Sequence, residues 1–157
     1  MKNTSPKLEF YNKIKSKFEL ENYLTTVENT SHRENFTRYR ISCHNLYIER
    51  GRYENPLVPR ENRWCVYCYT HYGLKPIEDE THVLTACPLY RGIINKNHSA
   101  LKDPSTLVDM LANPKLESGK IRAISKTIDE ILTINEKYTS YYKSEGFHDL
   151  TGDCVIL

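Results

Sequence analysis

The sequence predicts a mainly α fold, in which a helical domain carries one small irregular insert. Apolar residues recur at three- and four-residue spacing through most of the chain, which is the pattern of one face of an amphipathic helix. No stretch sustains the strict alternation of apolar and polar residues that is typical of a half-buried strand. Residues 63–90 differ from the rest, because they hold three of the five cysteines and two prolines within a short span.

The N-terminal part is predicted to be helical. Phe10, Ile14 and Phe18 recur at four-residue intervals. The same apolar face continues through Tyr23, Leu24 and Val27. Residues 6–28 are therefore expected to form one or two helices.

A further helix is predicted over residues 33–48. Ser31 followed by Glu34 has the form of a capping box, in which two side chains bind the free amides at a helix start. The apolar face of this helix comprises Phe36, Tyr39, Cys43 and Leu46. Gly51 is expected to stop the helical stretch, and the two prolines in residues 55–62 predict a loop.

Shorter helices are predicted beyond the insert. Residues 90–101 are expected to form one of them. The dipeptide Asp103-Pro104 has the form of an N-cap followed by proline at the first helical position. The helix that it opens is expected to close at Asn113-Pro114.

The longest helical pattern covers residues 117–142. Its apolar stripe comprises Ile121, Ile124, Ile128, Ile131 and Leu132, and such a stripe is typical of a core-facing helix. The tail has no period and is expected to be flexible. The chain thus divides into an N-terminal helical segment, a central part, C-terminal helices and a tail, at residues 1–30, 31–93, 94–143 and 144–157.

Composition indicates a soluble globular protein of one domain's length. The 157 residues are 39% hydrophobic and 27% charged, and the net charge is only +2. Residues 1–63 are more basic, with twelve Lys and Arg against eight acids. No apolar run is long enough to span a bilayer, and the first residues lack the apolar region of a secretory signal. We therefore expect an intracellular protein, in the nucleus or the cytoplasm, and not a secreted one.

The insert contains a metal-ligand pattern. Two residues separate Cys65 from Cys68, thirteen separate Cys68 from His82, and four separate His82 from Cys87. Zinc binds four sulfur or nitrogen donors at the corners of a tetrahedron, and clustered cysteines in a reducing compartment are more often ligands than disulfides. The pattern predicts one structural Zn²⁺ in a CCHC knuckle. Because protein atoms take all four positions, none is left for an activated water.

The second ligand pair is expected on a short helix. The acidic residues 78–80 suit the positive end of that helix, and Pro88 is expected to end it. His71, three residues beyond Cys68, competes as the fourth ligand. His82 is preferred because the longer gap lets the second pair move independently to close the tetrahedron. The remaining interpretation is that the cysteines are small buried side chains and that His82 is an ordinary surface histidine.

Two motifs flank the first cysteine pair. The first reads R-x-S-x-H-x-L-x-I-E-x-G-R-Y, with its matches at Arg40, Ser42, His44, Leu46, Ile48, Glu49, Gly51, Arg52 and Tyr53. The second reads E-D-E-x-H-x-L-x-x-C-P-x-Y, with its matches at Glu78, Asp79, Glu80, His82, Leu84, Cys87, Pro88 and Tyr90. Through these motifs residues 38–93, about a third of the chain, resemble the zinc-knuckle region that follows the reverse transcriptase domain in non-LTR (LINE-like) retrotransposon proteins.

This resemblance implies both a cofactor and a partner. It implies that Cys65, Cys68, His82 and Cys87 bind zinc, and that the module lies beside template RNA or target DNA. The chain departs from the family because no segment resembles polymerase fingers or palm, and none supplies a catalytic aspartate pair. No Ser/His/Asp arrangement or glycine-rich phosphate loop stands out. We therefore expect a non-catalytic, zinc-dependent module that binds nucleic acid and derives from a retroelement reading frame.

Arginines of the central part are the expected nucleic-acid contacts. Six arginines and no lysine lie between residues 38 and 63, and a guanidinium group binds phosphate through two hydrogen bonds. Nearby tyrosine and tryptophan rings offer surfaces for base stacking. The candidate contacts are Arg38, Arg40, His44, Arg52, Arg60 and Arg63. The alternative is that Arg40, Glu49 and Arg52 form ion pairs that fix this helix against the knuckle.

The last four residues form a candidate site for lipid attachment. Cys154 to Leu157 satisfy the C-a-a-X pattern, and the final leucine favours geranylgeranyl as the lipid on Cys154. A membrane is a partner only through that lipid, because no polybasic run precedes the cysteine. The alternative function is accordingly a zinc-stapled helical module that binds a protein partner, with or without this lipid. Salt-sensitive nucleic-acid binding belongs only to the first function.

Overall fold

The regular elements of the protein are helices. The computed structural model describes residues 6–15, 17, 19–97, 105–113 and 115–144. Extended structure in these residues is limited to one isolated antiparallel bridge between Trp64 and Ile77. The mainly α class predicted from the sequence is therefore confirmed. No helix in the described part of the chain is long and apolar enough to cross a membrane.

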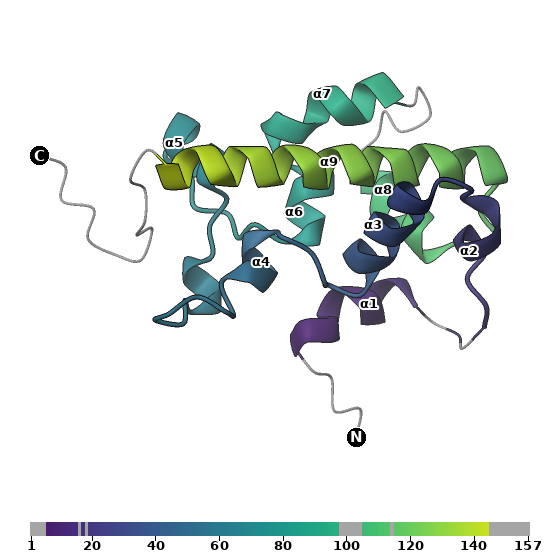
Figure 1. Ribbon diagram of the computed structural model, residues 1–157, viewed down its shortest axis with the longest axis horizontal. Helices are drawn as coiled ribbons and strands as arrows, with labels where there is room; N and C mark the ends of the chain where they lie inside the picture. The colour runs from purple at the N-terminus through teal and green to yellow at the C-terminus, as the bar shows by residue number, and fades with distance from the viewer. Residues whose placement is uncertain (1–5, 16, 18, 98–104, 114, 145–157) are drawn as a thin grey trace, which may run out of the picture.

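Helix α9 (Ser118–Ser144) organises the fold. Its 27 residues correspond to a rod of about 40 Å, which runs along the long axis of the molecule (Figure 1). The apolar stripe predicted from the sequence is buried at all five positions. Three helices pack on α9, namely α2 (Tyr23–Thr26), α3 (Thr30–Arg40) and α7 (Pro88–Asn97). In Figure 1, α7 lies above α9 and α3 below it.

The N-terminal part contains two separate short helices. A 3-10 turn, η1 (Pro6–Leu8), leads into α1 (Glu9–Ile14), and α2 is the next helix along the chain. Phe10 and Ile14 of α1 are buried, as their spacing predicts. The Phe10 ring meets Tyr39 of α3 edge to face, with 5.7 Å between ring centroids. Helix α1 also packs on α8 (Ser105–Ala112).

The capping box predicted at the start of α3 is wrong. The helix begins earlier, and the side-chain oxygen of Asn29 accepts a hydrogen bond from the His32 amide at 3.0 Å. Asparagine is as good an N-cap as serine, so the earlier residue takes the role. The Ser31 hydroxyl instead donates to Asp129 of α9 at 2.8 Å. This contact helps to fix α3 against the central helix.

The helix predicted over residues 33–48 is interrupted. α3 ends at Arg40, and Ser42 has a φ of 52°, in the left-handed region where a right-handed helix cannot continue. A short helix, α4 (Tyr47–Arg50), follows and stops at Gly51, as predicted. The loop predicted over residues 55–62 is present, with one 3-10 turn, η2 (Arg60–Asn62), at its end.

The C-terminal helices match their predicted order. α7 starts at Pro88, two residues earlier than predicted, and it runs to Asn97 across the boundary proposed at residue 93. α8 ends at Ala112, beside the predicted stop. The predicted start of that helix at Asp103-Pro104 lies outside the described residues. The same holds for the tail beyond Ser144, including Cys154 and its proposed lipid.

Candidate metal centre

A short hairpin positions the first two cysteines. Cys65 precedes α5 (Val66–Tyr72) as its N-terminal flanking residue, and Cys68 lies in the first turn of that helix. The amide of Cys65 donates to the carbonyl of Pro76 at 2.8 Å, next to the Trp64–Ile77 bridge. Gly73 ends α5 with a φ of 64°, which lets the chain turn back toward the bridge. Both thiols consequently lie on one side of the hairpin.

A second helix positions the other two donors. α6 (Glu80–Thr85) begins after Asp79, whose carboxylate accepts a hydrogen bond from the His82 amide at 2.8 Å. The prediction that acidic residues suit this helix start is confirmed at Asp79. Cys87 follows the end of α6, and its amide donates to the His82 carbonyl at 2.9 Å. Pro88 was expected to end this helix, but α6 ends at Thr85 and Pro88 begins α7.

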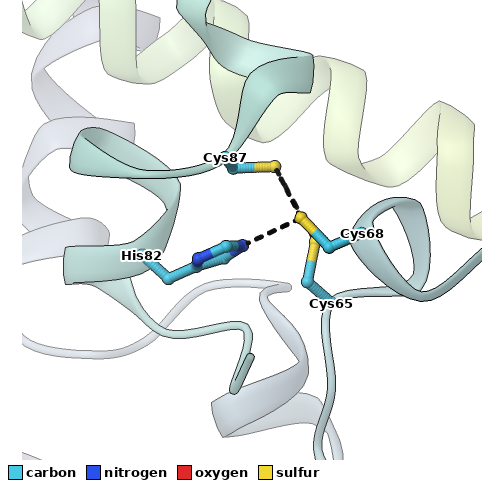
Figure 2. A group of neighbouring side chains, drawn as sticks. All are labelled: Cys65, Cys68, His82 and Cys87. Atoms are coloured by element: carbon cyan, nitrogen blue, oxygen red, sulfur yellow. Dashed lines mark hydrogen bonds between the residues drawn. The ribbon is translucent and has the colours of Figure 1, made fainter. Parts of the chain in front are cut away.

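The four side chains point at one another (Figure 2). The Cys87 Sγ atom lies 3.8 Å from Cys65 Sγ and 3.9 Å from Cys68 Sγ. His82 Nε2 lies 3.5 Å from Cys68 Sγ. All four donor atoms lie within 4.8 Å of one another.

Three of the six separations match the edges of a coordination tetrahedron. Metal–sulfur bonds of about 2.3 Å and a metal–nitrogen bond of about 2.0 Å require S···S edges of about 3.8 Å and S···N edges of about 3.5 Å. Three edges of the group agree with these values to about a tenth of an ångström. The group of Cys65, Cys68, His82 and Cys87 can therefore hold one metal ion.

The thiols are buried and crowded. A hydrogen bond with Cys87, followed by burial, raises the pKa of Cys65 well above its ordinary value. Burial, followed by the neighbouring Cys65, raises the pKa of Cys68 to about 11. Metal ligation requires thiolates, so an ion that binds here displaces these protons. Affinity for such an ion consequently increases with pH in the range below these pKa values.

His71, the competing fourth ligand, lies outside the group. It is exposed on α5, and its Nδ1 lies 3.1 Å from the Tyr67 carbonyl oxygen. Its ring stacks on that of Tyr67, with 4.3 Å between centroids. The preference for His82 over His71 therefore agrees with the geometry.

Three of the six residues expected to contact nucleic acid are buried. Arg40 donates to the Leu111 carbonyl at 2.6 Å and to the Glu21 carboxylate at 2.9 Å. His44 Nε2 lies 2.9 Å from the Glu80 carboxylate. The exposed fractions of Arg40, His44 and Arg63 are 4%, 8% and 6%. Their interpretation as nucleic-acid contacts is corrected, because their polar atoms bond within the chain.

The other three residues are more accessible. Arg38 is exposed on α3. Arg52 forms an ion pair with Glu49 at 2.9 Å, as the structural alternative anticipated. Arg60 pairs with Glu9 at 2.7 Å, and about 40% of its side chain remains exposed. Only these three members of the set present charge at the surface.

Arg63 explains why Gly51 has no side chain. The guanidinium of Arg63 donates twice to the Val58 carbonyl and once to the Ile48 carbonyl, at 2.8–2.9 Å. A Cβ atom on Gly51 would lie 2.9 Å from three atoms of this fixed side chain. The close approach requires glycine at this position.

Gly51→Ala is therefore expected to destabilise the fold by about 1–3 kcal/mol, the usual cost of overpacking. The free energy of unfolding from denaturant titration measures this effect. Gly92→Ala is the matched control, because a Cβ there meets nothing within 4 Å and alanine is the better helix former. Equal stability of the two variants would contradict the assigned role of Arg63.

The two sequence motifs meet at a buried carboxylate. Glu80 Oε1 accepts from the Ser42 hydroxyl at 2.5 Å and lies 2.9 Å from His44 Nε2. The Leu46 amide donates to His44 Nδ1 at 3.3 Å, so Nε2 carries the proton that points at Glu80. Burial alone would raise the pKa of Glu80. The hydrogen bonds from His44 and Ser42 outweigh burial, so the pKa is lowered overall.

A second buried carboxylate links the knuckle to α9. Glu78 accepts from the Tyr47 amide at 2.7 Å and from the Asn135 side chain at 2.9 Å. Asn135 also donates to the Tyr90 hydroxyl at 3.0 Å. Burial raises the pKa of Glu78. The sequence analysis did not predict this network. Glu78 and Tyr90 are matched positions of the second motif and Tyr47 lies within the first, whereas Asn135 belongs to neither motif.

The geometry thus defines a compact Cys₃His centre between a hairpin and a helix, supported by buried acids. Neither the family models, the curated proteins nor the solved structures with which the chain was compared contain a match.

Proposed function

We propose that this chain is a non-catalytic zinc-binding module in which the ion fixes the hairpin of α5 to α6 and α7. The observation that carries the proposal is that three sulfurs and one imidazole nitrogen lie within 4.8 Å of one another, with three of their separations matching tetrahedron edges. Thiolate donors in tetrahedral arrangement favour zinc over the harder magnesium and calcium ions. Such a donor set leaves no coordination position for a substrate or a reactive water.

Native mass spectrometry with and without a chelator tests the metal. We expect one zinc ion per chain before chelation and none afterwards, together with a lower unfolding temperature. A metal-free chain with unchanged thermal unfolding on adding zinc would reject the proposal. Binding of a different metal at the same stoichiometry would retain the structural role and change only the identity of the ion.

We further propose that the partner is single-stranded RNA or DNA. The resemblance of residues 38–93 to the knuckle region of non-LTR retrotransposon proteins supports this partner. Arg38 is exposed on α3, and Arg52 and Arg60 remain partly accessible beside their ion-pair partners. Burial of the other three predicted contacts makes the basic surface smaller than the sequence suggested, so we expect weak and non-specific electrostatic binding.

A salt titration measures the contribution of phosphate contacts. Affinity for a single-stranded oligonucleotide is expected to fall linearly on a double-logarithmic plot, with a slope of about 0.7 per phosphate contact. Arg38→Gln should lower that slope by about one contact. Arg122→Gln is the control, because this arginine is also largely exposed but lies on α9 and pairs with Glu28. No binding at low salt would remove the nucleic-acid partner.

One observation favours a second candidate, a zinc-stapled module that binds protein. Tyr72 and Leu74 are 54% and 59% exposed beside the metal centre, where apolar side chains form a contact surface. Binding to a protein partner through them would be largely insensitive to salt. The salt titration therefore separates the two candidates.

A further inference from the structure

An apolar cleft opens beside the metal centre. It has a volume of about 420 Å³, whereas two other hollows of the molecule hold only about 40 and 20 Å³. Its size falls within the roughly 300–1,000 Å³ that is typical of small-molecule sites. The residues that line it are Cys68, Tyr72, Leu74, Lys75, Pro76, His82, Ala86 and Pro88. Two of the four metal donors thus form part of its wall.

The rim of the cleft combines an aromatic ring with a cation. Tyr72 is 54% exposed at the end of α5, so its ring is accessible to a ligand. The Lys75 ammonium lies 4.1 Å from the centre of the Trp64 ring and 5.6 Å from that of Tyr69. These cation–π contacts restrain the lysine near the cleft. No carboxylate is among the described residues that line it.

We propose that this cleft receives an unpaired nucleobase, which stacks on Tyr72 while a neighbouring phosphate binds Lys75. A base is flat and apolar on its faces and is linked to an anion, which matches an apolar wall with one cation and no acid. An apolar peptide side chain would pack against the wall but would offer no negative charge to the Lys75 ammonium. The inference rests on the proposed nucleic-acid partner and assigns the part of the surface that reads bases.

Phosphate and base contacts can be separated by probe design. The probes are a short fluorescein-labelled oligothymidylate and a matched oligomer of the same length that lacks every base, and the protein is the zinc-loaded chain. Fluorescence anisotropy gives both affinities. We expect the base-bearing oligomer to bind the wild-type chain about 5- to 100-fold more tightly, in keeping with stacking of one base.

Two substitutions then assign the roles. Tyr72→Ala should remove most of that preference and leave binding of the abasic oligomer unchanged. Lys75→Gln should weaken binding of both oligomers and lower the salt slope by about one contact. Tyr141→Ala is the control, because Tyr141 is similarly exposed, at 58%, but does not line the cleft. It should leave both affinities unchanged.

The outcomes separate a failure of base binding in the cleft from a failure of the proposed nucleic-acid partner. If wild-type and Tyr72→Ala chains bind both oligomers equally, the cleft does not take bases, although nucleic-acid binding itself stands. If Tyr72→Ala and Tyr141→Ala reduce binding alike, aromatic exposure in general and not this cleft is responsible. If the zinc-loaded wild-type chain binds neither oligomer at low salt, the nucleic-acid partner falls together with the inference, and an apolar peptide becomes the occupant to test.

Discussion

Replacing Cys65 by serine is expected to abolish metal binding and to unfold the hairpin that carries α5. A serine hydroxyl does not ionise near neutral pH and is a poor ligand for a soft metal, so only three donors remain. In small zinc modules the apparent free energy of zinc binding is on the order of 10–16 kcal/mol, and this binding is what folds the module. Whole domains are stable by only about 5–15 kcal/mol, so the loss is large.

The damage should be concentrated around the knuckle. The two arms of the hairpin are otherwise joined by few backbone hydrogen bonds, from Cys65 to Pro76, from Leu74 to Cys68 and from Glu78 to Arg63. Helix α9 also packs on α3, and its residues Ile124 and Ile128 are fully buried without being metal donors. Hydrogen exchange should therefore become fast in residues 63–88 while the middle of α9 retains protection.

Metal content and hydrogen exchange of the Cys65→Ser chain check this expectation directly. Cys43→Ser is the matched control, because Cys43 is a free, exposed cysteine outside the donor group. This control should retain one ion per chain and unfold within about 0.5 kcal/mol of the wild type. One ion bound to the Cys65→Ser chain, with normal protection of the hairpin, would show that the four side chains do not form the site.

The metal donors and the central helix were predictable because their signals are local. A tight turn brings two cysteines at two-residue spacing together, and His82 lies close in sequence to Cys87. The expectation that one helix presents both His82 and Cys87 was wrong, because Cys87 lies beyond the end of α6. The apolar stripe of α9 repeats every three to four residues over a long stretch, so its buried face follows from helical geometry alone. Neither inference required knowledge of which distant segments meet.

The polar core was not predictable in the same way. Arg40 bonds to the Leu111 carbonyl, and His44 bonds to Glu80, at sequence separations of 71 and 36 residues. Read along the chain, an arginine and a histidine in a basic region resemble a phosphate-binding surface. The break of α3 near Ser42 has the same origin, since the chain leaves the helix where Ser42 and His44 can both reach Glu80.

That network leads to the second large effect, which is expected on replacing Glu80 by alanine. The substitution removes the acceptor of the Ser42 hydroxyl and of His44 Nε2, and both donors are buried. Hydrogen bonds to a charged group contribute about 1.5–3 kcal/mol each, and an orphaned buried donor retains its desolvation cost. We therefore expect a loss of about 3–5 kcal/mol in the free energy of unfolding, measured by denaturant titration in excess zinc.

A double-mutant cycle with His44→Ala separates the pair from general disruption. If His44 and Glu80 act together, the double variant should be more stable than the sum of the single losses predicts, by about 1–3 kcal/mol. Glu117→Ala is the control, because 76% of that side chain is exposed and its contact with Lys120 is long, at 4.0 Å. Additive losses, or a Glu80→Ala chain within 1 kcal/mol of the control, would mean that the two motifs meet without stabilising each other. The attachment of the knuckle to α3 would then depend on other contacts, such as the hydrogen bond that the Tyr39 hydroxyl donates to the Glu80 carbonyl at 2.6 Å.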